Sequence, residues 1–254
     1  IVEECENAQY ISSVFSAMKK TGDVRIVFDY RKLNLITKKL MHPIPNTTEL
    51  LSKFKDKKFI TSLDMKGGYW HIPIKKEHRK RTAFVFNGKI YNFKVLPFGP
   101  TNAPMFFQQC MQRIFSKLDF VVIYLDDISI LSSTVEEHKD HLSQVFELLE
   151  HHCIKLRIDK CIWGVSETEY LGFIVDKSGV TTKPSYIKKI LDVPRPKTRT
   201  GLQRFIGLAQ YLHLFCPQMH HDLSVLTPMT RSSQPKSLKF NAKQIKAFEN
   251  IKNI

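Results

Sequence analysis

The sequence predicts an α+β fold, and two kinds of apolar pattern support this class. Residues 121–131 contain two short runs rich in Val and Ile, which are typical of buried strands. Elsewhere apolar residues recur at helical spacing, as they do over residues 142–149. Beyond about residue 180 the helical pattern dominates, so we expect a mixed α+β body followed by a helical part.

Charge points to a polyanionic partner. The chain has 254 residues, of which 39 are Lys or Arg and 24 are Asp or Glu, for a formal charge of +15. This balance favours nucleic acid first and a membrane surface second, and an excess that only keeps the chain in solution is the alternative. The basic residues are interleaved with Tyr, Phe and Trp, which favours a binding groove over a charged tail.

The cysteine count and the ends of the chain narrow the class further. Five cysteines without a Cys-x-x-Cys pair argue against a disulfide framework or a zinc ribbon, and they fit a reduced intracellular protein. No apolar run approaches the roughly 20 residues of a membrane helix, and we find no signal peptide. The chain starts at Ile1 and stops inside an amphipathic pattern, so we expect a fragment of something longer.

The first elements are predicted to be strands. Strand-like residues from position 11 lead to a turn at Gly22-Asp23, and a second strand follows over residues 24–31. Alternation puts Arg25, Val27 and Asp29 on one face of that strand. Arg25 could be offered to a phosphate there, and a half-exposed strand with solvated charges is the alternative.

A break and a third strand come next. Pro43 interrupts the pattern, and Asn46 or Thr47 is expected to cap a short helix. Residues 59–65 then predict a strand that ends in the carboxylate of Asp64. A Gly-Gly pair and two large aromatic residues follow it, so the backbone is expected to turn sharply after Asp64.

Further elements lead up to an acidic pair, Asp126 and Asp127. Residues 75–81 form a basic cluster that we expect to be a loop, and Asn87-Gly88 is a strong hairpin signal between two strands. Residues 97–104 predict a rigid loop that feeds a helix capped by Thr101 or Asn102. The stripe on this helix that we expect in the core is Phe107, Met111, Ile114 and Leu118.

The elements after the acidic pair are also marked by local signals. Thr134 and Glu137 form a capping box for a helix whose predicted core residues are Leu142, Val145, Phe146 and Leu149. The later predictions are a short strand and turn over 155–160, a strand over 169–175, a turn at 178–179, helices from Pro184 and from Thr200 to Pro217, and a linker over 228–240.

Asp126 and Asp127 are adjacent where the hairpin over residues 121–131 must turn. A tight turn lets both carboxylates reach one edge of a sheet, and divalent cations would relieve their repulsion. Together with Asp64 they make a set of three carboxylates, the usual means of holding two magnesium ions about 4 Å apart for phosphoryl transfer. The alternative is a surface hairpin with acidic turn residues.

These motifs, taken together, resemble the reverse transcriptase of gypsy-like retrotransposons with long terminal repeats, which are relatives of retroviruses. The matching stretches are residues 27–34, 62–70, 96–104, 124–127 and 169–172, with a thumb-like stretch over 201–217. They occur in the family's order and spacing and cover nearly the whole chain. Pro100 departs from the Leu that this group more often has.

The resemblance implies a right-hand polymerase, with fingers, a palm of antiparallel sheet and helices, and a helical thumb. The implied boundaries are fingers over 1–62 and 77–100, palm over 63–76 and 101–178, thumb over 179–230, and over 231–254 a linker and the start of a connection toward an RNase H that this chain lacks.

The resemblance also implies roles for residues. Asp64 and Asp126 would hold two Mg²⁺ ions, with Mn²⁺ as an alternative. Asp127 would support the negative electrostatic field around them. Tyr69 would block a ribose 2′-hydroxyl. The implied nucleotide-binding residues are Lys19 or Lys20, Arg25, Tyr69, Phe98, Gly99 and Lys160. The implied nucleic-acid contacts are Tyr124, Leu125, Leu171 and Gly172.

The implied activity is DNA synthesis from dNTPs on an RNA or DNA template with a primer. Implied partners are the RNase H, protease and integrase parts of one polyprotein, a dimer is an additional option, and no membrane is involved. The implied location is a cytoplasmic virus-like particle or the nucleus. Two alternatives remain: a domesticated or decayed copy that only binds nucleic acid, and a polymerase of the group II intron or non-LTR type, which fits less well.

Overall fold

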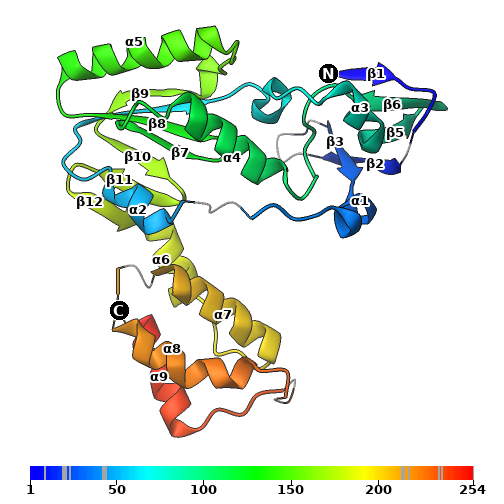
Figure 1. Ribbon diagram of the computed structural model, residues 1–254. Helices are drawn as coiled ribbons and strands as arrows, with labels where there is room; N and C mark the ends of the chain where they lie inside the picture. Colours follow the sequence, from blue (N-terminus) through cyan, green and yellow to red (C-terminus); the bar gives the residue numbers. More distant parts are fainter. Residues whose placement is uncertain are drawn as a thin grey trace. The chain divides into compact units, whose positions relative to one another are not determined.

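The computed structural model describes residues 1–8, 10–18, 22, 24–41, 45–212, 215–216, 218–233, 235 and 237–253. The chain forms two compact units (Figure 1). The first unit comprises Ile1–Asn46 and Lys57–Ser166, and the second comprises Thr47–Asp56 and Glu167–Ile254. These units are defined by packing, so the boundaries of fingers, palm and thumb stay predictions.

The first unit begins with a five-stranded sheet in the order β1-β6-β5-β2-β3. Its strands are β1 (Val2–Glu4), β2 (Ile11–Met18), β3 (Val24–Asp29), β5 (Ala83–Phe86) and β6 (Lys89–Phe93). Asn87 and Gly88 join β5 to β6 at φ angles of 49° and 73°, which confirms the predicted hairpin. The ring of Phe28 packs 4.8 Å from that of Phe84 and 5.0 Å from that of Phe93, so aromatic contacts hold this sheet together.

A four-stranded antiparallel sheet forms the rest of the first unit, in the order β7-β8-β4-β9. Its strands are β4 (Phe59–Asp64), β7 (Val121–Tyr124), β8 (Asp127–Ser132) and β9 (Ile162–Val165). The helix α4 (Ala103–Ile114) packs on β7 and α5 (Val135–His151) packs on β8. The shorter helices of this unit are α1 (Arg31–Ile36), η1 (Gly68–His71), α3 (Lys76–Arg79), η2 (Lys80–Thr82) and η3 (Ile158–Lys160).

The core of this sheet is built as the sequence predicts in its main parts. Phe107 and Met111 on α4 are fully buried, and they join Ile128 on β8 and Val145 and Leu149 on α5 in one apolar cluster. Burial of such side chains is the main favourable contribution to folding, about 1.5–3 kcal/mol each. The core therefore fixes β7 and β8, and with them the edge at which the acidic pair stands.

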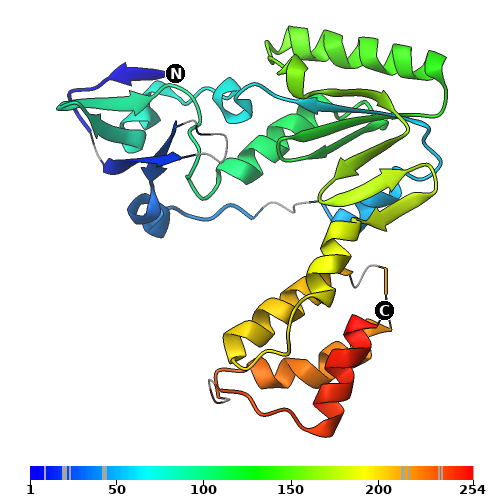
Figure 2. The ribbon, with the colours of Figure 1, turned by 180° about the vertical axis from the view of Figure 1, so that it is seen from behind.

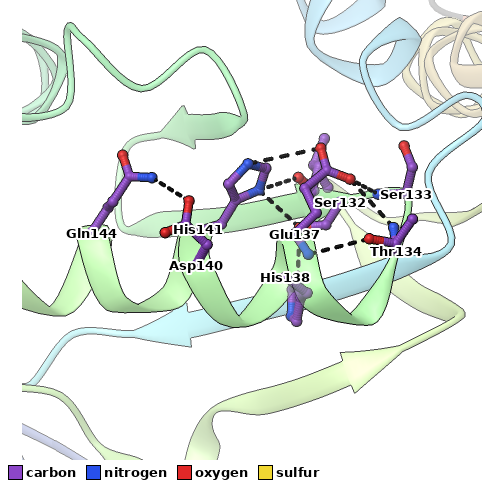
Figure 3. Close-up of polar contacts among 9 residues, drawn as sticks. Ser132, Ser133, Thr134, Glu137, His138, Asp140, His141 and Gln144 are labelled. Carbon is purple, nitrogen blue, oxygen red and sulfur yellow. Dashed lines mark hydrogen bonds and ion pairs between the residues drawn. The ribbon is translucent and has the colours of Figure 1, made fainter.

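The predicted capping box at the start of α5 is confirmed (Figure 3). The hydroxyl oxygen of Thr134 accepts a hydrogen bond from the Glu137 amide, and the Glu137 carboxylate accepts from the Thr134 amide. One turn later the buried His138 has a ring nitrogen 2.8 Å from Ser132 Oγ and the other 2.7 Å from Thr61 Oγ1. A polar contact that the sequence did not predict therefore ties α5 to β4 and β8.

The second unit combines a small sheet with a helical cluster. Its elements are α2 (Thr47–Ser52), the antiparallel strands β10 (Glu167–Tyr170), β11 (Phe173–Asp176) and β12 (Gly179–Thr182), and the helices α6 (Pro184–Leu191), α7 (Arg199–Leu212), α8 (Met219–Leu226), η4 (Thr227–Thr230) and α9 (Ala242–Lys252). The apolar residues that recur at helical spacing along α7 are buried: Leu202, Phe205, Ile206, Ala209 and Leu212.

The helix α9 belongs to this cluster. Ala247, Phe248 and Ile251 are buried in the same core as α7 and α8, and the rings of Phe205 and Phe248 lie 4.5 Å apart. The side-by-side packing of α8 and α9 is visible from the front and from behind (Figure 2). Packing therefore does not separate residues 242–252 from the helices of the predicted thumb, although we expected a linker and a connection there.

The prediction of one strand over residues 169–175 was wrong. The chain turns between β10 and β11 at Leu171 and Gly172, whose φ angles are 52° and 86°. Glycine adopts a positive φ without steric cost, so a two-residue turn fits inside what looks like a continuous apolar run. The strand prediction failed because the run contains no other turn signal.

Three further predictions need correction. Phe146 is 40% exposed, because it lies one position around α5 from Val145 and rests beside Trp163 instead of in the core. The basic cluster at 75–81 is largely helical, as α3 and η2, and not a loop. Over 155–160 only Leu156 forms a strand-like bridge, with Met65.

Some predictions fall outside the described residues, namely Asp23 of the first turn and the breaks at Pro43 and Pro217. The five cysteines carry free thiols. Within the described ranges, no helix is long and apolar enough to cross a membrane.

Candidate active site

The three predicted carboxylates lie at one edge of the four-stranded sheet. Asp127 opens β8, where it pairs with Tyr124 of β7 on one side and with Asp64 of β4 on the other. Asp126 stands beside it in the turn, after Leu125, whose φ is 52°. The antiparallel register thus brings Asp64 next to a pair that is 62 positions away in sequence.

A buried amide holds this turn. Gln108 on α4 is fully buried, its Nε2 donates to the Ile123 carbonyl at 3.1 Å, and its Oε1 accepts from the Leu125 amide at 2.5 Å. One side chain therefore fixes the backbone before and inside the turn. No sequence motif singled out Gln108, although a polar residue beside the buried Phe107 of an apolar stripe is the signal that could have identified it.

The carboxylates repel one another. The side chains of Asp126 and Asp127 remain accessible to solvent. The surrounding protein still displaces enough water to raise both pKa values, and the charge of Asp64 raises them further. The pKa of Asp127 is also raised by Asp126. The guanidinium of Arg157 opposes this trend at Asp126 and donates from Nε to Asp64 Oδ1 at 2.7 Å.

The three carboxylates have the chemistry of a site for divalent ions, but their side chains are not arranged as one in this structure. Across the described part of the chain, no three His, Cys, Asp or Glu side chains already converge as a metal-binding group. The three neighbouring carboxylates supply the hard oxygen ligands that Mg²⁺ prefers. The pKa values of Asp126 and Asp127 are raised by lost water and by charge repulsion, and a cation would relieve that repulsion. Asp64, Asp126 and Asp127 could therefore hold ions once Asp64 turns toward the pair.

An aromatic stack adjoins the acidic edge. Tyr69 in η1 is buried and its ring lies 4.7 Å from that of Phe98, over which the Arg25 guanidinium stands at 5.5 Å from the centroid. Burial and the charge of Asp126 raise the pKa of Tyr69 to about 12. The structure thus brings together three of the predicted nucleotide-binding residues and one carboxylate.

Two glycines make this packing feasible. A Cβ at Gly68 would lie 3.2 Å from the Phe107 ring and 3.3 Å from Asp126 Oδ1. Gly99 has a φ of 109° and stands where a Cβ would come within 3.0 Å of the Tyr30 ring. Its carbonyl accepts from the side chain of Asn34. The backbone next to Phe98 is therefore held in place from a distant helix.

Of the other predicted site residues, Tyr124 and Leu125 lie directly before the acidic pair. Lys19 and Lys20 are outside the described residues. Lys160 is exposed in η3, and Tyr124 ends β7. Leu171 and Gly172 form the β10–β11 turn of the second unit, where the Tyr211 hydroxyl donates to the Leu171 carbonyl at 3.1 Å. The individual roles of all these residues stay predictions.

Three relatives share about a third of their residues with this chain. A putative enzymatic polyprotein of Cassava vein mosaic virus is 33% identical over 91% of the chain. The retrovirus-related Pol polyprotein from transposon 297 of Drosophila melanogaster is 34% identical over 97%, and the transposon Tf2-3 polyprotein of Schizosaccharomyces pombe is 32% identical over 92%. The chain spans only 36%, 24% and 18% of these polyproteins.

Solved structures agree on the fold. A foamy viral protease–reverse transcriptase in complex with double-stranded DNA has a TM-score of 0.89 at 23% identity, over 99% of this chain and 44% of that one. The foamy viral protein with an RNA/DNA hybrid has a TM-score of 0.80 at 22% identity, over 100% of this chain and 34% of that one. These likenesses confirm the predicted right-hand polymerase fold.

The family model described as reverse transcriptase (RNA-dependent DNA polymerase) matches residues 17–175. This segment includes the acidic edge, the aromatic stack and Gln108. Because the match covers more than half of the sequence, the chain belongs to the reverse transcriptase family.

Proposed function

We propose that this chain is the polymerase part of a retroelement polyprotein and transfers deoxynucleotides from dNTPs to a primer 3′-hydroxyl on an RNA or DNA template. The observation that carries this proposal is the meeting of Asp64, Asp126 and Asp127 at one sheet edge inside the segment that matches the family. The aromatic stack beside them and the charge of +15 support a nucleic-acid substrate.

Each group at the site has a task in this reaction. Asp64 and Asp126 hold two Mg²⁺ ions, for which Mn²⁺ can substitute, and Asp127 strengthens the local negative field. When bound, the ions supply an activated 3′-hydroxyl and stabilise charge on the phosphate under attack. Tyr69, rigidly stacked on Phe98, excludes a ribose 2′-hydroxyl.

The remaining predicted residues bind the substrates. Arg25, with Lys19 or Lys20, grips the triphosphate, and Lys160 lies near the leaving pyrophosphate. Phe98 and Gly99 cover the incoming base. Tyr124 and Leu125, with Leu171 and Gly172, contact the primer–template.

The relatives support a finer assignment. The polyproteins of transposons 297 and Tf2-3 favour a gypsy-like element with long terminal repeats as the source. In such a polyprotein, protease, RNase H and integrase parts accompany the polymerase, which works as a monomer or a dimer. It acts in a cytoplasmic virus-like particle or in the nucleus.

Primer extension tests the activity. On poly(rA)/oligo(dT) with Mg²⁺, we expect the parent chain to extend the primer and Asp126→Asn to lose roughly 10²–10³-fold or more of the rate, because a ligand of the ions that stabilise charge on the reacting phosphate is gone. Asp119→Asn, just before β7, is the matched control and should extend normally. No extension by the parent chain, with primer–template binding intact, would refute the polymerase and favour a copy that only binds nucleic acid.

A further inference from the structure

Asp64 has a cationic partner that the proposed reaction does not use. Arg157 lies just before η3, and its Nε donates to Asp64 Oδ1 at 2.7 Å. The Arg157 amide also donates to the Asp64 carbonyl at 2.9 Å. The two residues are 93 positions apart in sequence, so the tertiary fold and not local geometry pairs them.

The backbone around Arg157 leaves it little choice of position. Leu156 forms an antiparallel bridge with Met65, and the Lys66 amide donates to the Lys155 carbonyl at 2.8 Å. These contacts run alongside the end of β4. Arg157 is thereby placed directly beside Asp64, whatever its side chain does.

The thiol of Cys161 contacts the backbone of both residues. Its Sγ donates to the Arg157 carbonyl at 3.2 Å and accepts from the Asp64 amide at 3.4 Å. The backbones of Asp64 and Arg157 are thus tied to each other and to the start of β9. Only the two side chains remain able to change partners.

The ion pair itself is easy to break. The side chain of Arg157 is 41% exposed and that of Asp64 is 34% exposed, and ion pairs with this much solvent around them contribute little net stability. A divalent cation carries twice the charge of a guanidinium and offers closer contact to a carboxylate oxygen. It is therefore the stronger partner for Asp64 at sufficient concentration.

We propose that Arg157 is a positioning residue that occupies the Asp64 carboxylate in the metal-free enzyme and competes with the divalent cation for it. The proposal rests on the proposed function, because it takes the three carboxylates to be the metal site. It accounts for the lack of a converged metal-binding group among the described residues, since Asp64 is turned to Arg157. It also makes the metal affinity of this enzyme depend on a residue that binds no metal.

The sign of the effect separates this role from a structural one. A guanidinium a few ångströms from the bound ions repels them, so its removal should strengthen binding, by about tenfold where water screens the charges. A residue that only props up the site would weaken metal binding when removed. Arg157→Lys keeps the charge, so its affinity should stay within about threefold of the parent.

Manganese binding provides the measurement. Free Mn²⁺ is followed by its electron paramagnetic resonance signal during titration of the parent chain, Arg157→Gln, Arg157→Lys and Asp126→Asn. The matched control is Arg31→Gln, which removes an Arg–Asp pair from the same unit, with Asp29, and should leave affinity unchanged. We expect about tenfold tighter binding for Arg157→Gln alone.

The outcomes distinguish the two proposals. If the parent binds no more Mn²⁺ than Asp126→Asn, both the proposed function and this inference are overturned. If the parent binds specifically and Arg157→Gln binds equally or more weakly, only this inference is overturned. Tighter binding by Arg157→Gln together with a near-parental Arg157→Lys supports it.

A second measurement uses the unaltered chain, in case Arg157→Gln does not fold. The Nε–H signal of Arg157 in a nitrogen-15 spectrum, assigned with Arg157→Lys, reports its hydrogen bond to Asp64. Saturating Mg²⁺ should move this signal toward that of a solvated arginine. A signal that stays in place at saturation would show that the ion pair survives metal binding, and the inference would be wrong.

Discussion

Two hairpin turns, one in each unit, place a leucine in the same unusual conformation. Leu125 in the β7–β8 turn and Leu171 in the β10–β11 turn both have a φ of 52°, a region that side-chain-bearing residues rarely adopt. Each turn is then pinned by one side chain from a helix of its own unit. The two side chains differ in burial and in the number of backbone groups that they bond, so they hold the two turns to different degrees.

The first turn is held by a buried amide and the second by a partly exposed phenol. Gln108 bonds two backbone groups near Leu125, and no water can replace it because it is fully buried. Tyr211 bonds one, the Leu171 carbonyl, and its ring stacks 4.3 Å from that of Phe173. The turn that carries the acidic pair is therefore held by more side-chain hydrogen bonds than the turn that carries a glycine.

Gly172→Val should give the largest loss of stability. The new residue would be held at a φ of 86°, and its Cβ would collide with the Tyr211 hydroxyl. We expect a loss of about 3 kcal/mol in the free energy of unfolding, because strain and overlap add. Urea unfolding measures it. Gly88→Val is the matched control, since Gly88 has a φ of 73° and open space around it, and an equal loss there would show that contact with Tyr211 contributes nothing.

Gln108→Leu should cost slightly less stability, and its effect should be focused on the β7–β8 turn. The Leu125 amide and the Ile123 carbonyl lose their partner, for about 2–3 kcal/mol, whereas Tyr211→Phe removes one hydrogen bond for about 1 kcal/mol. Hydrogen exchange at the Leu125 amide should accelerate in Gln108→Leu and stay unchanged in Tyr211→Phe. Equal exchange in both variants would mean that the amide does not hold the turn.

The two turns also show how far the sequence allows prediction. The first was predictable because an acidic pair interrupts a run of Val and Ile, and polar residues between apolar runs indicate a turn. The second was missed because Leu171-Gly172 lies between the aromatic residues Tyr170 and Phe173, with no polar residue to mark the turn. A single glycine in such a run fits a strand as well as a turn, and only the register of β10 and β11 decides between them.

Local signals predicted local structure, whereas the long-range hydrogen bonds of Gln108 and Arg157 escaped prediction. The capping box at Thr134 and the stripe on α4 involve residues three or four positions apart, so the sequence states them directly. Gln108 reaches Leu125 across 17 positions and Arg157 reaches Asp64 across 93. Whether such polar residues face solvent or a partner depends on the packing of strands, which no short motif encodes.

The acidic turns should also differ in how they titrate, and this is the smallest of the expected effects. The pKa values of Asp126 and Asp127 are raised above 3.8 by displaced water and neighbouring carboxylates. That of Asp176, in the β11–β12 turn, is lowered because the Ser178 hydroxyl and amide donate to its carboxylate.

The stability contributions then have opposite signs. The fold favours neutral Asp126 and Asp127, so these residues reduce stability as pH rises from 3.8 through their folded pKa values. Asp176 contributes stability above 3.8 that is lost as pH falls through its lower folded pKa. Carbon-13 carboxyl spectra across this range should resolve the three midpoints, and Mg²⁺ should lower the first two while leaving Asp176 in place. A midpoint for Asp126 at or below that of Asp176 would contradict the inference that burial and neighbouring carboxylates raise the pKa of Asp126.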